Sequence, residues 1–272
     1  IFHLGYLLLL NSLDKEDPEY GIAAARALDG LLKMGYETSV DVVSEEGDRY
    51  RHVVLPCLKY TDYLIINEVE AENSLDIRLR KADGTIRFSD VEAAARRLLE
   101  LGVRKLVVIH FPEGGVVASA DGRCCSAPSF SPAREEIVST VGAGDAFCAG
   151  ALYAIHEGYS LEDLLAFAAA SARFNLFSST STGGAPTLEA IKKYLETKQD
   201  YENQIAAIEQ EIERVRDIIT DMFKQQKTYE IIDENRKIRA QHEEDLKLQK
   251  QLDEIGTNSY IKHHEENNQG EP

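Results

Sequence analysis

The sequence predicts an α/β fold with a doubly wound, mostly parallel sheet, followed by a long helical or coiled-coil tail. From residue 1 to about residue 196, short apolar runs alternate with stretches of helical periodicity. That alternation is typical of parallel strands joined by helices. Between Pro186 and Gly256 the chain contains neither Gly nor Pro. Nothing in that region is expected to interrupt a helix.

The first strands and helices can be placed in chain order. An apolar opening run at residues 1–10 predicts the first strand. Two predicted helices stop at glycine, the residue favoured just after a helix: Tyr20–Met34 before Gly35, and Val91–Leu101 before Gly102. The other predicted strands are Glu37–Val43, Asp62–Asn67 and Arg104–His110.

A hairpin and three helices complete this part. Asp121–Gly122 stands between residues 116–120 and 123–127, and such a dipeptide between apolar runs is a strong hairpin signal. The helices expected after it are Gly144–His156, Leu161–Leu176 and Thr187–Leu195.

The tail carries a narrow apolar seam with alternating spacings of 3 and 4. Its residues are Ile205, Ile208, Ile212, Val215, Ile219 and Met222. The seam predicts a coiled coil or a helical hairpin, with a long solvated helix as the alternative. The predicted domains are therefore residues 1–196, a helical tail at 197–256, and a polar, disordered end at 257–272.

Composition narrows the class of protein. The 272 residues are 43% hydrophobic, which is enough for a sizeable core. A net charge of -17 argues against electrostatic binding of nucleic acid. No apolar run is long enough to span a membrane and no signal-peptide pattern is present, so we expect a cytoplasmic protein. The four cysteines lack metal-ligand spacing and are expected to be reduced thiols.

The stretch Ser139–Gly150, with the sequence STVGAGDAFCAG, carries the clearest chemical signal. Its glycines allow a tight turn, and the apolar residues after them predict a helix whose positive end faces that turn. Asp145 would stand in the first helical turn, where a carboxylate can take a proton from a hydroxyl that attacks a bound phosphate. The motif predicts phosphoryl transfer to an alcohol. Alone, it is equally well explained as a turn and a helix cap.

Three further segments bear on this loop. Asn67 and Glu70 follow a predicted strand, where an acidic residue can hold Mg2+ through water or simply begin a helix. The segment His110–Gly115 turns after another strand, so its glycines permit close approach of a nucleotide or merely form a hairpin. Ser178–Pro186 is a loop of small residues that could also be a helix stop.

Taken together, these ordered motifs resemble the ribokinase-like, or PfkB-type, carbohydrate kinases over about residues 1–196. The resemblance implies an ATP-dependent sugar kinase that uses Mg2+. It implies that Asp145 is the catalytic base and that Gly142, Ala143 and Gly144 form the anion hole. It also assigns magnesium and phosphate organisation to Asn67 and Glu70, with Glu70 as the metal residue. Gly115 and Gly184 match glycines that line the nucleotide pocket.

Departures from the family pattern qualify these expectations. Many members carry Asp six positions before the catalytic aspartate in a monovalent-cation site, whereas this chain has Ser139, so we expect no potassium activation. The pattern Asp, any residue, Asn becomes Asp41-Val42-Val43. The chain starts at Ile1 inside a strand pattern, so upstream sequence that supplies most of the sugar site is expected to be missing.

Two other readings stay open at this point. In the first, the kinase-like part is a non-catalytic remnant, and the chain is a module that oligomerises or binds a partner helix through the tail. Alternatively, the tail is an accidental appendage to a truncated reading frame.

Overall fold

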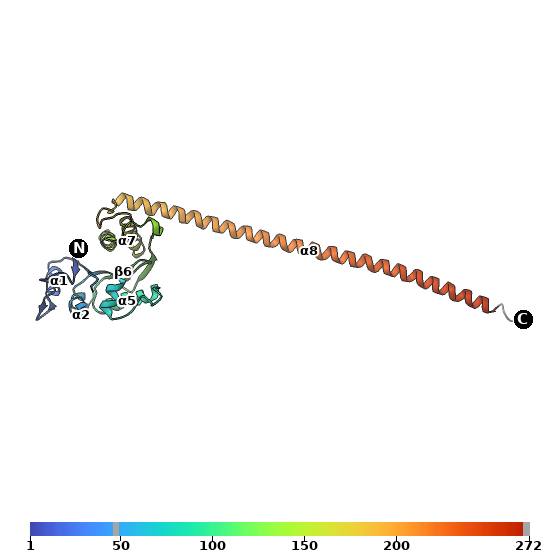
Figure 1. Cartoon of the computed structure of the whole chain (residues 1–272), viewed down its shortest axis with the longest axis horizontal. Coiled ribbons are helices and arrows are strands. Elements are labelled where there is room, and N and C mark those ends of the chain that lie inside the picture. Colours follow the sequence, from blue (N-terminus) through green and yellow to red (C-terminus); the bar gives the residue numbers. More distant parts are fainter. Residues whose placement is uncertain (46–48, 269–272) are drawn as a thin grey trace. The chain divides into compact units, whose positions relative to one another are not determined.

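In the computed structural model, residues 1–45 and 49–268 are described, and they divide into two compact units. The first is Ile1–Gln199 and the second is Asp200–Pro272. Figure 1 labels the main elements of the fold. In chain order the elements are β1 Phe2–Leu7, β2 Glu16–Asp17, β3 Gly21–Ile22, α1 Ala23–Lys33, β4 Thr38–Val42, α2 Arg49–Val53, α3 Leu55–Leu58, β5 Tyr63–Asn67, α4 Glu68–Leu75, α5 Phe88–Glu100, β6 Leu106–Phe111, β7 Gly114–Ser119, β8 Cys124–Pro128, the 3-10 turn Arg134–Glu136, α6 Ala143–His156, α7 Leu161–Asn175 and α8 Leu188–Asn268.

A six-stranded sheet forms the centre of the first unit, in the order β1-β4-β5-β6-β7-β8. The pairs β1–β4, β4–β5 and β5–β6 are parallel, and β6–β7 and β7–β8 are antiparallel. The mostly parallel α/β sheet predicted from the sequence is confirmed. Because parallel strands all end at the same edge, the residues that follow β1, β4, β5 and β6 gather there.

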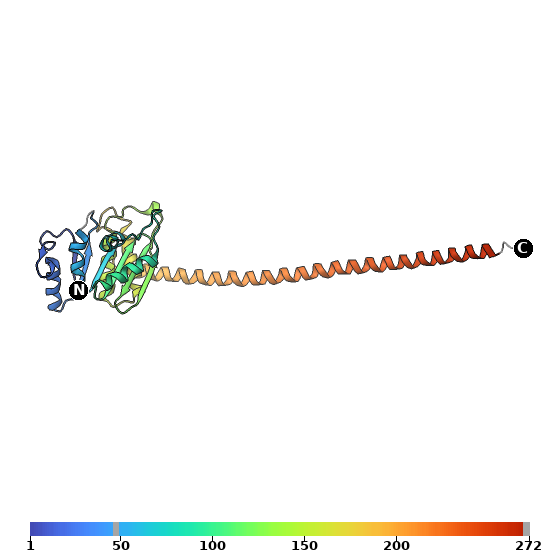
Figure 2. The same cartoon turned by 90° about the horizontal axis from the view of Figure 1, so that it is seen from below.

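Helices cover both faces of the sheet, as a doubly wound fold requires. Successive residues of β6 point to opposite sides, so Val107 and Ile109 enter the core that contains α1 and α5, whereas Val108 enters the core formed with α6 and α7. Figure 1 shows α5 and α7 on opposite sides of β6, and Figure 2 views the sheet from the side on which α5 lies. All three side chains are fully buried. Burial on both faces explains why this strand is a continuous apolar run.

The first helix of the structure begins three residues later than the sequence predicts. Helix α1 begins at Ala23 because Gly21 and Ile22 pair with Glu16 and Asp17 in a two-stranded ribbon. The ribbon removes these residues from the helix that the apolar periodicity predicted.

The carboxyl-terminal part is one uninterrupted helix, which excludes the predicted hairpin alternative for the described residues. It also corrects the expectation of disorder at 257–272, since α8 extends to Asn268, and residues 269–272 lie outside the described residues. A single Gly256 costs a helix only about 1 kcal/mol. The hydroxyl of Thr257 also donates to the carbonyl oxygen of Asp253 at 2.8 Å. The domain boundaries proposed from the sequence stay a prediction.

Candidate active site

A cavity of about 250 Å³ lies at the carboxyl edge of the parallel strands. It brings together residues that are distant in the sequence. Among those that line it are Tyr6, Asp41, Asn67, Glu70, His110 and Asp145. Gly142 and Gly144 line the same cavity. Five of the predicted site residues therefore meet in one place: Asn67, Glu70, Gly142, Gly144 and Asp145.

The start of α6 is built as the sequence predicts. Gly142 precedes the helix with a φ of 79°, a left-handed conformation that favours glycine. A Cβ atom at this position would also lie 2.4 Å from the carbonyl oxygen of Ser181. Glycine is thus required twice, once for backbone conformation and once for space.

The backbone N–H groups of this turn differ in their availability. That of Ala143 donates to the carbonyl oxygen of Thr140 at 3.2 Å. Across residues 1–45 and 49–268, no hydrogen bond engages the N–H of Gly142, Gly144 or Asp145. Free N–H groups at a helix start carry partial positive charge and can bind an anion. The N–H groups that this turn leaves available to an anion are therefore those of Gly142, Gly144 and Asp145.

Asp145 is exposed and lies in the first turn of α6. Its Oδ1 accepts a hydrogen bond from the hydroxyl of Tyr6 at 3.0 Å. That hydrogen bond and the negative charge of Asp145 raise the pKa of Tyr6. Tyr6 is half exposed and has a φ of 61°, at a point where the register of β1 against β4 shifts. The irregular strand end thus directs a phenol onto the candidate base.

The carboxylate of Asp41 holds the backbone of β1 where its register shifts. Oδ1 of Asp41 accepts a hydrogen bond from the backbone N–H of Tyr6 at 2.5 Å. Oδ2 of Asp41 lies 3.5 Å from Nε2 of His3. Asp41 was noted in the sequence only as part of a departure from the family pattern, yet it lines the cavity beside Asp145.

Asn67 and Glu70 form a reciprocal cap at the start of α4. The side chain of Asn67 accepts from the backbone N–H of Glu70 at 2.9 Å, and Oε2 of Glu70 accepts from the backbone N–H of Asn67 at 2.9 Å. Oε1 of Glu70 accepts from the hydroxyl of Ser44 at 2.9 Å and from the amide of Asn67 at 2.8 Å. Burial raises the pKa of Glu70 to about 7. Both carboxylate oxygens are engaged, so a cation would meet Glu70 through water.

A second cavity, of about 380 Å³, adjoins the same turn. Phe111, Ile137, Phe147 and Leu176 give it an apolar lining, and Arg173 brings a positive charge to it. His110 lines both cavities and stacks on the ring of Phe147, with 4.7 Å between ring centroids. Burial lowers the pKa of His110 to about 4, so its imidazole is neutral at pH 7.

Two predicted nucleotide-pocket glycines occupy packed positions. A Cβ atom on Gly115 would lie 3.2 Å from Cδ2 of Leu165 and 3.4 Å from Cζ of Phe147. One on Gly184 would lie 2.7 Å from Cα of Asn175. Gly114, next to Gly115, lines the apolar cavity. The binding roles assigned to Gly115 and Gly184 stay predictions.

The first unit also matches a known protein family. A family model described as pfkB family carbohydrate kinase matches residues 2–188, which is more than half of the chain. The chain belongs to the pfkB family of carbohydrate kinases. The match ends at the first residue of α8.

Individual pfkB relatives are similar over part of their length. A 5-dehydro-2-deoxygluconokinase of Clostridium beijerinckii is 32% identical over 116 residues, which is 42% of this chain and 33% of that protein. A ribokinase of Schizosaccharomyces pombe is 33% identical over 132 residues, which is 48% of this chain and 39% of that protein. The matched segments thus span about a third to two fifths of these two pfkB relatives.

Among solved structures, the fold is similar to that of Arabidopsis thaliana ribokinase, which was determined with ribose and ATP. The TM-score is 0.50 at 22% identity, over 62% of this chain and 50% of that chain. The similarity supports a ribokinase-like fold for the first unit of this pfkB chain.

Tyr6 and Asp41 line the cavity of this pfkB chain, but neither was predicted as a site residue. Tyr6 sits in an apolar run where nothing but its own polarity distinguishes it. The signal for Asp41 was its place near the end of a predicted strand, which the structure pairs with the strand that ends at Asn67.

Proposed function

We propose that the chain transfers the γ-phosphoryl group of ATP to a hydroxyl of a sugar or a sugar-like small molecule. One observation carries the proposal: Asp145 and the free N–H groups of Gly144 and Asp145 start the same helix, beside a cavity at the sheet edge. N–H groups fixed in this way stabilise charge on a transferring phosphoryl group, and a neighbouring carboxylate takes the proton of the acceptor. The pfkB relatives named as sugar kinases support the choice of acceptor.

The residues present fit a nucleotide with its metal. The apolar cavity lined by Phe111, Phe147 and Leu176 suits a flat base, and the N–H groups of α6 suit its phosphates. ATP with Mg2+ would supply the phosphoryl group and neutralise its charge. Gly142 to Asp145 would hold the phosphates, and Glu70 would face the cation through water.

Asp145 then performs the proton step. It is exposed toward the cavity and shares its Oδ1 with the hydroxyl of Tyr6. An acceptor hydroxyl that replaces this phenol would donate to the same oxygen and lose its proton there as the new O–P bond forms. Positioning and charge stabilisation account for most of the acceleration in such transfers.

Replacing Asp145 by Asn tests the proposal. The whole chain is incubated with ATP, Mg2+ and a panel of pentoses, hexoses, sugar acids and nucleosides, and ADP formation is measured. We expect Asp145→Asn to lower turnover by about 10²–10⁴-fold with nucleotide binding kept. Glu157→Gln, an exposed acid at the other end of α6, is the control. Turnover that equals the parent in Asp145→Asn, or no turnover by the parent on any acceptor, contradicts the proposal.

A second candidate is a kinase-like module that associates through its tail. Ile205, Ile208 and Ile212 of the seam are about half exposed on α8, at 56%, 60% and 48%. An apolar seam of this period is buried when two such helices pair. Light scattering on the chain cut after Glu196 and on the whole chain tests this candidate. A larger assembly for the whole chain alone supports it, and equal monomers contradict it.

No described helix combines the length and the apolar content needed to cross a membrane. All four cysteines are free thiols. We propose a reducing, cytoplasmic setting for the protein on the grounds of its cysteine use.

A further inference from the structure

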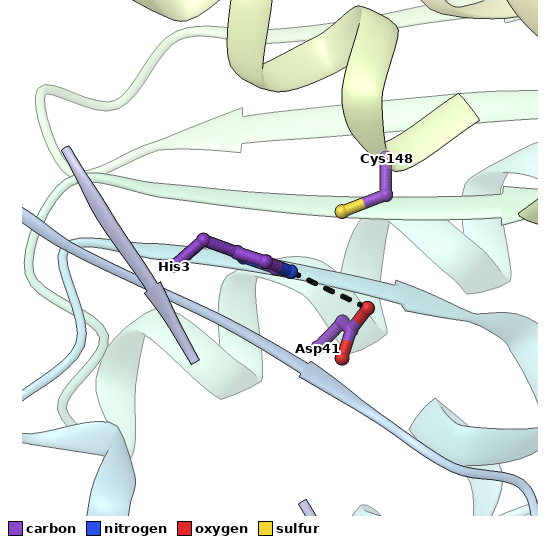
Figure 3. Close-up of side chains that lie close together, drawn as sticks. All are labelled: His3, Asp41 and Cys148. Atoms are coloured by element: carbon purple, nitrogen blue, oxygen red, sulfur yellow. Dashed lines mark ion pairs between the residues drawn. The ribbon is translucent and has the colours of Figure 1, made fainter. Parts of the chain in front are cut away.

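Three potential metal ligands from three separate elements meet beside the candidate active site. They are a ring nitrogen of His3 on β1, a carboxylate oxygen of Asp41 on β4 and Sγ of Cys148 on α6, all within 4.8 Å of one another. Figure 3 shows Cys148 pointing from its helix toward the His3 and Asp41 side chains. Cysteine, histidine and aspartate are all side-chain types that bind zinc.

The spacing of His3 and Asp41 fits a shared cation better than a direct bond. Nε2 of His3 and Oδ2 of Asp41 are 3.5 Å apart, which is too far for a good hydrogen bond. Zinc binds nitrogen at about 2.0–2.1 Å and oxygen at about 2.0–2.2 Å, so two such ligands at a tetrahedral angle lie about 3.4 Å apart. The observed separation is therefore close to the one that a tetrahedral ion imposes.

The ring of His3 is already oriented for this role. Its Nδ1 lies 3.2 Å from the hydroxyl oxygen of Ser39, on the neighbouring strand. If Nδ1 carries the proton and donates a hydrogen bond to Ser39, Nε2 holds a lone pair that faces the carboxylate of Asp41. A hydrogen bond from the ring nitrogen that does not bind the metal fixes the tautomer of most metal-binding histidines. The two lone pairs then repel each other unless a positive charge stands between them.

Asp41 is also held from its other side. The backbone N–H of Tyr6 donates to Oδ1 of Asp41, which leaves Oδ2 directed at His3. Cys148 is buried, and its side chain reaches the cluster from α6 rather than from the sheet. Zinc binds sulfur at about 2.3 Å, so the Cys148 side chain would close on the ion as it binds.

We propose that His3, Asp41 and Cys148 bind one Zn2+ ion, whose fourth position opens to the cavity of Asp145. Asp41 and Cys148 both line that cavity, so water or an oxygen of a small molecule can occupy the open position. Three protein ligands and one exchangeable ligand are the usual arrangement of a reactive zinc site. On binding, the Cys148 thiol releases its proton to solvent and the sulfur coordinates as thiolate.

The site has a mechanical consequence as well. It would join β1, β4 and α6 within one turn of Asp145, since Cys148 follows Asp145 by three residues on the same helix face. An ion held there fixes the distance between the helix and the edge of the sheet.

Cobalt titration of the whole, untagged chain tests the proposal. Co2+ takes the place of Zn2+ and reports a bound thiolate by a sulfur-to-cobalt charge-transfer band in the near ultraviolet. We expect saturation at one ion per chain, displacement by one equivalent of Zn2+, and no displacement by millimolar Mg2+, which avoids thiolate ligands. Neither nucleotide nor sugar is present, so the result is independent of the proposed kinase activity.

Substitutions identify the ligands. Cys148→Ser should abolish the charge-transfer band, and His3→Gln, at an exposed position, should weaken binding by about 10–100-fold while the band of residual complex persists. Cys124→Ser and Cys125→Ser, at an adjacent pair on β8, are controls that should bind as the parent does. Circular dichroism confirms that each variant is folded. Absence of the band in the parent, or its survival in Cys148→Ser, overturns the proposal.

Discussion

The hydroxyl of Tyr6 donates a hydrogen bond to Oδ1 of Asp145 at 3.0 Å, across 139 positions of sequence. In the proposed mechanism, the phenol occupies the place on the carboxylate that an acceptor hydroxyl needs. The contact joins the first strand to the start of α6 at the proposed catalytic base. An acceptor would have to displace it before the proposed reaction.

Tyr6→Phe therefore should ease substrate binding. Loss of one hydrogen bond is worth about 1 kcal/mol, so we expect the KM for the acceptor to fall about fivefold with kcat nearly unchanged. Steady-state kinetics with the best acceptor measure both constants. A loss of kcat by orders of magnitude at constant KM would instead make the phenol a direct participant in catalysis.

Gly142→Ala should destabilise the fold strongly. The new Cβ meets the backbone of Ser181 at 2.4 Å and the residue must keep a φ of 79°. We expect a loss of more than about 2 kcal/mol, because the strained conformation alone costs about 1–2 kcal/mol. Gly158→Ala is the control, since Gly158 has a φ of 70° and nothing within 4 Å of its Cβ position. Equal losses in urea unfolding would show that space at Gly142 is unimportant.

Two helix glycines should respond to alanine in opposite directions. Gly30, in α1, has nothing within 4 Å of its Cβ position, so Gly30→Ala should stabilise the protein by about 1 kcal/mol. Gly150, in α6, faces Oγ of Ser171 at 2.5 Å, so Gly150→Ala should destabilise it by about 1–3 kcal/mol. Thermal unfolding of both variants is the measurement, and stabilisation by Gly150→Ala would contradict the close packing of α6 on α7.

Glu70 should make stability depend on pH. Burial raises its pKa from 4.5 to about 7, so the folded chain holds this proton more tightly than the unfolded chain does. Its contribution is complete below pH 4.5 and is lost as the pH rises to about 7. Relative to Glu70→Gln, the parent should lose up to about 3 kcal/mol of unfolding free energy across this window.

The quantity to compare between the parent and Glu70→Gln is the slope of the unfolding free energy with pH. Absolute stabilities differ for another reason, because the amide of glutamine also changes the contact with the backbone N–H of Asn67. Parallel slopes for the parent and Glu70→Gln would show that Glu70 ionises normally in the folded protein.

Local patterns in the sequence were sufficient for much of the fold. The strand Tyr63–Asn67 and the helix Ala143–His156 fall within a residue or two of their predicted ranges, because buried apolar runs and the glycine turn determine them locally. The helix start at Asn67 and Glu70 was likewise one of the two interpretations of that segment, although the reciprocal cap was not predicted. The strand and the helix are both determined by residues close to one another in the sequence.

Contacts between distant strands could not be predicted in this way. The meeting of His3, Asp41 and Cys148 depends on the register of β1 against β4 and on where α6 crosses them. The cysteine spacing therefore gave no hint of a metal cluster. The expected disorder after residue 256 failed for a different reason, since a polar composition is compatible with a solvated helix.

The closed hydrogen-bond ring of Asn67, Glu70 and Ser44 bears on which ion the chain would accept with ATP. A cation that contacts this carboxylate only through its own water ligands is selected by its hydrated size and its charge density. The softness of the protein ligand then has little effect on which cation binds. Mn2+ and Co2+ should then substitute for Mg2+ at this place with little loss, whereas Ca2+, with its looser and larger shell, should serve poorly.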